Sequence, residues 1–569
     1  MMARTNTPAL RGALRNLRAR PLTLPQQRLF SASSRYLATD KDKQSQQPSF
    51  KSQLYESTQQ RLKRERAEQE RFAQYQQTQS PGGRYAALMF ALVFFSSGAY
   101  YLGSLKPASL PSTSTTTLND LDAPRHNITP SNLQAAWVDF VEILGKENVS
   151  TNDGDLTSHA GSDWSSYTAK ETEKPFLILY PSTTDEVSRC MKICHARLIP
   201  VTPYSGGTSL EGHFASTRGG VCIDFRRMDR ILSLHKRDLD VVVQPALGWE
   251  DLNEELAKDG LFFPPDPGPG AMIGGDGRDG VYLTVVLADG TVIKTRQRPR
   301  KSSAGYDLTR LFIGSEGTLG LVTEATLKLT VKPQSTNVAV ASFGSIAHAA
   351  ECVTSVVEAG IPVAGVEILD DVQMKCINAS QSTSRQWKES PTIFFKFTGT
   401  PAAVKEQIGG EEMAELWSAR KQALWSVMAM RRGAGDHVWT TDVAVPMSKL
   451  PDIIEATKAD MTESGLLAGI CGHVGDGNFH AIILFNDGEK NVAEGVVHRM
   501  VKRAVEMEGT VTGEHGVGLV KRDYLAHELG ETTVDAMRRL KLAYDPLRLL
   551  NCDKVVRIEQ PAPGEVKEW

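Results

Sequence analysis

Residues 203–213 read PYSGGTSLEGH and follow the short apolar run 199–202, which predicts a β-strand. The small residues of this stretch allow consecutive backbone N–H groups to converge on one anion, so the loop can hold a diphosphate without Lys or Mg²⁺. The stretch has neither the spacing of a Walker loop nor that of the GxGxxG fingerprint. Taken alone, it is also compatible with a plain turn.

Two more loops of this character follow along the chain. Residues 261–268 (LFFPPDPG) form a stiff, proline-rich turn after a helix expected over 249–258. Residues 314–323 (GSEGTLGLVT) follow a predicted strand and offer a second glycine-rich backbone surface. Strands are expected at 219–224, 241–245 and 282–287. Short strands and helices therefore alternate around the three loops.

The three loops, in this order, resemble the FAD-binding domain of the vanillyl-alcohol oxidase type. The chain also resembles, over about residues 134–569, the mitochondrial, cytochrome-linked D-lactate dehydrogenases of fungi. The resemblance implies non-covalently bound FAD. It assigns cofactor contacts to Pro203, Ser205, Gly206, Gly207, Thr208, Ser209, Gly212, His213, Pro264, Asp266, Pro267, Gly268, Gly274, Gly275, Glu316, Gly317, Gly320, Val322 and, less directly, Asn551.

The same resemblance implies the domain organisation and an α+β fold. A two-subdomain FAD-binding domain is expected over 134–335, and an α+β cap with an antiparallel sheet over 336–545. Residues 546–569 are expected to return to the FAD-binding domain. Composition agrees with a globular protein, since 41% of residues are hydrophobic and 23% are charged. A net charge of −3 gives no indication of nucleic-acid binding.

The chain departs from the family after Gly275. Relatives continue there through a long stretch of small and aromatic residues that lines the flavin, whereas here residues 276–281 lead directly into the strand at 282–287. A second shortening is expected at 408–411, between a strand over 392–398 and a helix over 411–430. Lost exons in the gene model would explain the shortening. The alternative is an inactive, membrane-tethered remnant that binds no flavin.

Residues 471–481 (CGHVGDGNFHA) predict a hairpin, because Asp-Gly is a favoured two-residue turn. Counting outward from this turn places His473 opposite His480, with Cβ atoms about 4.5–5.5 Å apart. Two imidazoles on one face can share a Zn²⁺ or Mn²⁺ ion if a third ligand is near. Residues 513–518 (GEHGVG) offer Glu514 and His515. The alternative is that the two motifs are unrelated surface turns.

Family resemblance assigns roles to these side chains. His473, His480 and Glu514 match the ligands of a divalent metal, and His515 matches the general base. Arg420 matches the residue that pairs with the carboxylate of a small 2-hydroxy acid. The implied reaction is the oxidation of D-lactate to pyruvate with cytochrome c as electron acceptor. D-2-hydroxyglutarate is the alternative substrate, but residues 439–442 (WTTD), near the expected position of a larger basic clamp, contain no Lys.

The first hundred residues predict a targeting sequence and a membrane-spanning segment. Residues 1–39 contain seven Arg and no Lys, Asp or Glu, which is typical of a mitochondrial transit peptide. Residues 40–84 form a charged linker. The uncharged run within 85–105 has about the 20 residues needed to cross a membrane, a buried core helix being the alternative. Basic residues precede this span, so the predicted location is the inner membrane with the catalytic part facing the intermembrane space.

Overall fold

The computed structural model describes residues 50–77, 89, 91–98, 113–268, 270–274, 280–407, 413–433, 435–566 and 569. The predicted transit peptide 1–39, Gly275 and the expected shortening at 408–411 lie outside these residues. The fold described below is that of the unit Ser49–Trp569.

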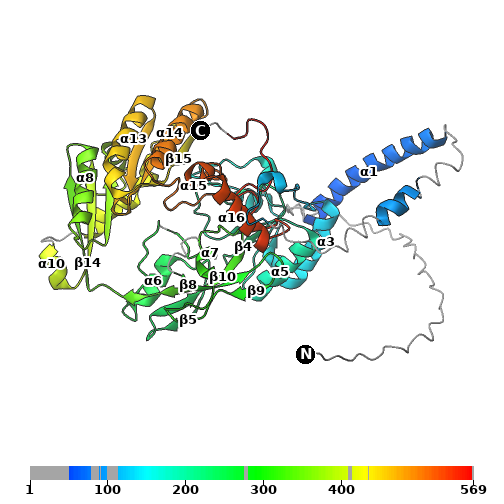
Figure 1. Ribbon diagram of the computed structural model, residues 1–569, viewed down its shortest axis with the longest axis horizontal. Helices are drawn as coiled ribbons and strands as arrows, with labels where there is room; N and C mark the ends of the chain where they lie inside the picture. The colour runs from blue at the N-terminus through cyan, green and yellow to red at the C-terminus, as the bar shows by residue number, and fades with distance from the viewer. Residues whose placement is uncertain are drawn as a thin grey trace, which may run out of the picture. The chain divides into compact units, whose positions relative to one another are not determined.

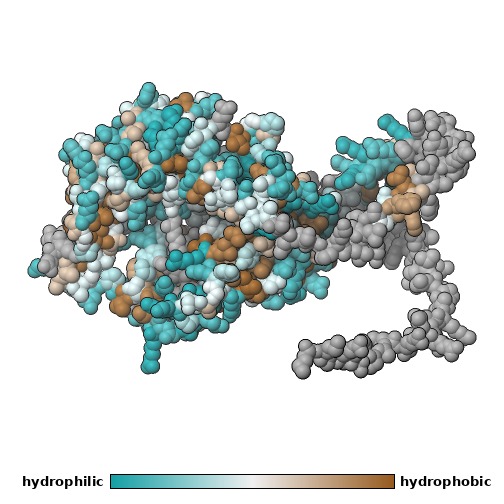
Figure 2. Space-filling model, viewed as in Figure 1, coloured by the Kyte–Doolittle hydropathy of each residue, from teal (hydrophilic) through white to brown (hydrophobic). Residues whose placement is uncertain are grey.

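Helix α1 (Phe50–Gln77) begins the described chain and falls within the predicted charged linker. Hydrophilic residues dominate this helix (Figure 2). Most of the predicted membrane span 85–105 lies outside the described residues. Among the residues that are described, no helix combines the length and the apolar character needed to cross a membrane.

The first subdomain of the FAD-binding domain is a small sheet with strand order β1-β2-β4-β3. Strands β2, β4 and β3 are parallel, and β1 is antiparallel to β2. Because parallel strands end at one edge, the loop 205–213 leaves the carboxyl edge of this sheet, where ligands of open α/β sheets bind. The elements are β1 (Val149–Ser150), α4 (Asp153–Ser158), β2 (Leu177–Leu179), β3 (Val201–Tyr204) and β4 (Val221–Asp224), with helices α3 (Pro130–Leu144) and α5 (Thr184–Arg197) packed together on the sheet.

The second subdomain is an antiparallel sheet with strand order β5-β6-β10-β8-β9. The strand and helix predictions in this region agree with the structure to within about two residues at each end. The exception is the strand predicted before the third loop, 314–323, which is wrong because the residues there form helix α7. The elements are β5 (Ile231–His235), β6 (Asp240–Val243), α6 (Trp249–Ala257), β7 (Leu261–Phe262), β8 (Gly280–Val286), β9 (Val292–Lys294), α7 (Leu308–Phe312), β10 (Leu321–Lys328) and β11 (Thr330–Val331), which pairs with β7.

The cap is an antiparallel sheet with strand order β12-β14-β13-β17-β18-β15, and β16 pairs with the start of β18. Alternate residues of its strands are buried on opposite faces. Phe395 and Ile483 pack on one face, and Phe394 and Ile482 on the other. The strands are β12 (Ser335–Ser342), β13 (Gly365–Leu369), β14 (Thr392–Gly399), β15 (Asp436–Thr440), β16 (Val443–Ala444), β17 (Leu467–Gly472) and β18 (Asn478–Asn486).

Helices cover both faces of the cap sheet. Figure 1 shows α8 (Ile346–Glu358), α13 (Leu450–Ser464) and α14 (Lys490–Glu506) side by side over one face. The other face packs against α9 (Asp371–Ser380), α11 (Met413–Lys421) and α12 (Ala423–Met428). The single helix predicted over 411–430 is therefore interrupted, at Gln422. Helix α10 (Pro401–Gln407) follows β14.

The C-terminal region joins the cap to the first subdomain. Helices α15 (Leu525–Leu529) and α16 (Glu531–Tyr544) are followed by a segment that runs beside β3. Val201 N donates to Leu549 O at 2.8 Å, and Asn551 N donates to Val201 O at 2.8 Å. These bonds place Asn551 directly against the strand that feeds the loop 205–213.

Candidate active site and cofactor loops

The predicted register of the histidine hairpin is wrong, because Cys471 rather than His473 lies opposite His480. The connection is longer than the predicted two-residue turn and contains a 3₁₀ turn, Val474–Asp476. It closes at Gly477, whose φ of +75° favours glycine. His473 therefore lies outside strand β17, at the start of the turn.

The two imidazoles nevertheless converge, on Glu514. Glu514 Oε1 lies 3.3 Å from His473 Nε2 and 3.0 Å from His480 Nε2. The opposite nitrogen of each ring faces a different oxygen: His473 Nδ1 is 2.6 Å from Glu367 Oε1, and His480 Nδ1 is 3.0 Å from Thr441 O. Both rings thus present Nε2 to the same point, which is the usual arrangement of metal-binding histidines with outer hydrogen-bond partners.

The charges of this trio are strongly coupled. Burial raises the pKa of Glu514, but its hydrogen bonds to His473 and His480 outweigh burial, and its pKa lies far below the usual value. Burial lowers the pKa of His473, but hydrogen bonds to Glu367 and Glu514 raise it to about 10. Burial dominates at His480, whose pKa is lowered. The Glu514 side chain is 36% exposed, so the trio is open to solvent on one side.

Arg420 lies beside this trio. Its Nε donates to Glu367 Oε2 at 2.6 Å, and its Nη2 lies 3.4 Å from His473 Nε2. The Glu367 carboxylate therefore touches both Arg420 and His473. No sequence motif points to Glu367, which is a lone Glu in strand β13.

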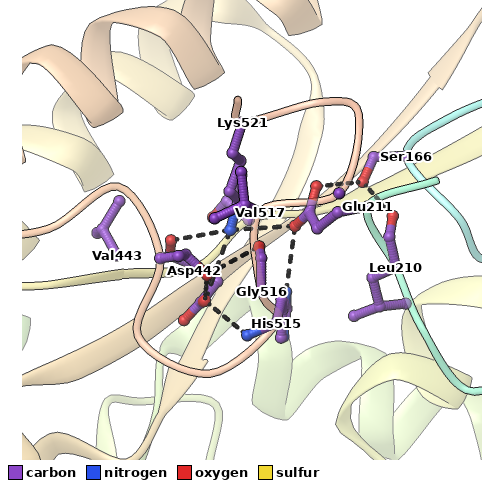
Figure 3. Close-up of polar contacts among 12 residues, drawn as sticks. Ser166, Leu210, Glu211, Asp442, Val443, His515, Gly516, Val517 and Lys521 are labelled. Atoms are coloured by element: carbon purple, nitrogen blue, oxygen red, sulfur yellow. Dashed lines mark hydrogen bonds and ion pairs between the residues drawn. The ribbon is translucent and has the colours of Figure 1, made fainter. Parts of the chain in front are cut away.

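A second group of buried charges surrounds His515 (Figure 3). Asp442 Oδ2 accepts hydrogen bonds from the backbone N–H groups of Glu514 and His515, both at 2.9 Å. Lys521 Nζ lies 3.0 Å from Glu211 Oε1 and 3.5 Å from Asp442 Oδ2. His515 Nδ1 is 3.5 Å from Glu211 Oε1. Glu211 belongs to the loop 203–213, so this network connects the first subdomain to the cap.

Both carboxylates of this network are held in their charged form. Burial raises the pKa of Glu211, but the charges of Lys521 and His515 outweigh burial, and its pKa lies below the usual value. Burial also raises the pKa of Asp442, but the charges of His515 and Lys521 bring it well below its usual value. No sequence motif assigns a role to Glu211, Asp442 or Lys521.

The proposed cofactor loops meet next to this network. His213 Nε2 lies 2.9 Å from Glu316 Oε2, and Asn551 Nδ2 donates to Glu316 O at 2.7 Å. A Cβ atom on Gly317 would lie 2.4 Å from Pro203 Cγ, so glycine permits the close approach of the first and third loops. Pro203 lies in β3, and the loop 205–213 contains the predicted contacts Ser205, Gly206, Gly207, Thr208, Ser209, Gly212 and His213. Gly320 directly precedes β10, and Val322 lies near the start of that strand.

The other predicted cofactor residues lie in two different regions, one beside the first loop and one against the cap. Gly274 lies beside the first loop, since a Cβ atom there would be 3.5 Å from Ser205 Oγ. The turn that contains Pro264, Asp266, Pro267 and Gly268 contacts the cap instead. Lys396 Nζ lies 2.7 Å from Asp266 Oδ2, so this side chain is already paired with a cap residue.

Comparison with known proteins identifies the family. Residues 175–277 match the FAD binding domain, and residues 332–555 match the C-terminal domain of FAD linked oxidases. The described fold agrees with that of 4-ethylphenol oxidase from Gulosibacter chungangensis at a TM-score of 0.63 and 16% identity, over 77% of this chain and 99% of the other. It agrees equally with p-cresol methylhydroxylase, at a TM-score of 0.63 and 16% identity, over 77% and 100%.

The chain belongs to the FAD-linked oxidases, in the group of mitochondrial D-lactate dehydrogenases of the cytochrome type. It is 46% identical to the Kluyveromyces lactis enzyme, D-lactate dehydrogenase (cytochrome), over 81% of this chain and 88% of the relative. It is 44% identical to D-lactate dehydrogenase (cytochrome) 1 of Saccharomyces cerevisiae, over 80% and 85%. The predicted family resemblance is thereby confirmed.

The alignments bear on the predicted shortening. The alignment with the K. lactis relative spans 507 positions. It covers 81% of the 569 residues of this chain, which is fewer than 507 residues. The S. cerevisiae alignment has 499 positions for 80% of the chain. This chain therefore lacks residues at some aligned positions. The two predicted places, 276–281 and 408–411, lie mostly outside the described residues.

Proposed function

We propose that this protein is an FAD-dependent D-lactate dehydrogenase that oxidises D-lactate to pyruvate and passes the electrons to cytochrome c. The observation that carries the proposal is the convergence of Arg420, the His473–His480–Glu514 trio and His515 beside the loop 203–213. The names of the relatives supply the substrate and the acceptor.

The residues around the loops fit FAD. Gly207 is buried, and its N–H has no acceptor among the described residues. The buried Oδ1 of Asn551 likewise has no hydrogen-bond partner within the described part of the chain. Polar groups of this kind are costly unless something binds them. Both ring nitrogens of His213 contact protein groups, Ser209 and Glu316, which supports non-covalent attachment.

The trio fits a divalent metal. Two imidazole Nε2 atoms and one carboxylate converge, and this donor set suits Zn²⁺ or Mn²⁺. When bound, such an ion supplies a Lewis acid that lowers the pKa of the substrate hydroxyl. The 36% exposure of Glu514 leaves an open side for a substrate.

Each remaining side chain has one task in this proposal. The Arg420 guanidinium, held through Nε, pairs with the substrate carboxylate through its Nη groups. His515 faces Glu211 with Nδ1, so Nε2 is the atom that accepts the hydroxyl proton. FAD, when bound, supplies the acceptor for the hydride that leaves Cα. The rings of His480 and His515 are stacked, with their centroids 4.9 Å apart. This stacking brings the proton acceptor next to the metal ligands.

We also propose that the protein is located in the mitochondrial inner membrane. The relatives are named mitochondrial, and the Arg-rich segment 1–39 supports import into that organelle. The uncharged run within 85–105 supports one inner-membrane helix, and the basic residues that precede it support an orientation in which the catalytic part faces the intermembrane space. Cytochrome c would then meet the enzyme in its own compartment.

Oxidation of D-lactate is the first expected result. Purified protein reconstituted with FAD is expected to show the visible flavin band, to lose it on addition of D-lactate, and to reduce ferricytochrome c. L-lactate serves as the negative control, and D-2-hydroxyglutarate, the alternative substrate, is expected to react more slowly. Protein that takes up no flavin on reconstitution would contradict the proposal and favour the inactive remnant.

Metal removal is expected to stop turnover without releasing flavin. Dialysis against EDTA should lower the rate with D-lactate by more than about tenfold, since a Lewis-acid metal contributes several kcal/mol to such reactions. Zn²⁺ or Mn²⁺ should restore the rate, and the flavin band should be unchanged throughout. Full activity in protein shown by elemental analysis to be metal-free would rule out the metal.

A further inference from the structure

Glu367, in the middle of strand β13, carries a buried carboxylate to which no role has been assigned so far. The residue is only 5% exposed, and it lies opposite Phe394, which belongs to the hydrophobic cluster on that face of the cap sheet. A charge in such a place is costly unless it is paired and hydrogen-bonded. Burial raises the pKa of Glu367, but the charge of Arg420 and the hydrogen bond to His473 outweigh burial, so its pKa lies below the usual value.

The two oxygens of this carboxylate serve two different partners. Oε1 lies 2.6 Å from His473 Nδ1, and Oε2 accepts from Arg420 Nε at 2.6 Å. The partners lie 106 and 53 residues away in sequence, so only the folded cap brings them to one carboxylate. Each is held by the nitrogen that faces away from the reaction. His473 Nε2 therefore faces Glu514, and Arg420 presents its Nη groups on the same side, with Nη2 3.4 Å from His473 Nε2.

We propose that Glu367 is a positioning residue that sets the metal ligand His473 and the substrate-binding Arg420 at the same time, so that the metal site and the carboxylate site share one support. This inference rests on the function proposed above. It differs from a purely structural role in a testable way, because one change at Glu367 should alter two separate binding events.

The substitution Glu367→Gln isolates this effect. The amide keeps one acceptor oxygen and replaces the other by an N–H donor, so it cannot accept from both His473 Nδ1–H and Arg420 Nε–H in the present geometry. The affinity for Mn²⁺, titrated into metal-free protein and followed by the electron paramagnetic resonance of free Mn²⁺, is expected to fall about 10–100-fold, as for other outer partners of metal ligands. The KM for D-lactate is expected to rise as well. Glu367→Asp, which keeps two acceptor oxygens, should recover part of both losses.

The matched control is Asp370→Asn. Asp370 follows the same strand, is fully buried, and pairs with Lys458 at 2.7 Å rather than with Arg420 or the trio. The Asp370→Asn substitution removes one buried carboxylate charge and should leave Mn²⁺ affinity and KM at wild-type values. Arg420→Lys and His473→Ala should each move mainly one readout, KM and Mn²⁺ affinity respectively.

Three results would overturn the proposal. A folded Glu367→Gln protein with wild-type Mn²⁺ affinity and KM would show that Glu367 supports neither site. A change in only one readout would show that the support is not shared. Wild-type protein that binds no Mn²⁺ would remove the proposal together with the metal-dependent function, and this failure is recognisable because it occurs before any substitution. If Glu367→Gln does not fold, Glu367→Asp carries the same comparison against Asp370→Asn.

Discussion

Replacing His515 by Gln is expected to lower kcat with D-lactate by about 10²–10⁴-fold, the usual contribution of a positioned general base. The physical reason is the surroundings of the ring. Asp442 fixes the backbone of Glu514 and His515, and Glu211 faces Nδ1. A Gln side chain keeps a polar group there but cannot accept a proton near pH 7.

Steady-state kinetics with D-lactate measures this effect, and two further readouts define it. The flavin band and the Mn²⁺ affinity should stay at wild-type values, since neither the cofactor loops nor the trio is altered. His437→Gln is the control, because that ring lies at the surface beside Asp487 and should have no effect. A His515→Gln protein with kcat within a few-fold of wild type would assign the proton transfer to another group.

Replacing Lys521 by Met is expected to lower the free energy of unfolding by about 3–5 kcal/mol, as when one partner of a buried ion pair is removed. Lys521 is only 4% exposed, and its Nζ lies close to Glu211 and Asp442. Met fills a similar volume, so the loss comes from leaving two buried carboxylates without their cation. Glu211→Gln in the Lys521→Met background should recover part of the loss.

Urea unfolding of the purified protein measures this change, with Lys236→Met as the matched control. Lys236 pairs with Asp259 at 2.6 Å, but its side chain is 60% exposed. Its loss should change the unfolding free energy by about 0.5 kcal/mol or less. Equal stability of the Lys521 and Lys236 variants would show that the buried network contributes nothing to stability.

Several parts of the fold and site are predictable from local sequence. Glycine-rich loops, proline turns and apolar runs act over a few residues, so the stretch 203–213 and the strands around it indicate the FAD-binding domain. The motifs that hold His473, His480 and Glu514 are equally local. Their residue types alone indicate metal and proton chemistry.

Local rules fail where longer connections decide the geometry. The Asp-Gly pair predicts a two-residue turn, yet the structure uses a 3₁₀ turn, and the register shifts so that Cys471 faces His480. Hairpin turn statistics do not include the contacts outside the hairpin. One of these is the tight packing of Gly477 against Val445 O, where a Cβ atom would lie 2.3 Å away.

The sequence alone therefore determines the family, the loops and the residue types of the site. The tertiary structure decides which charges meet. Glu367, Glu211, Asp442 and Lys521 belong to no motif that predicts a role, since a buried charge is explained only by its partners, and those partners lie far away in sequence. The low polarity of the interior makes these pairings strong, and only the folded chain brings them together.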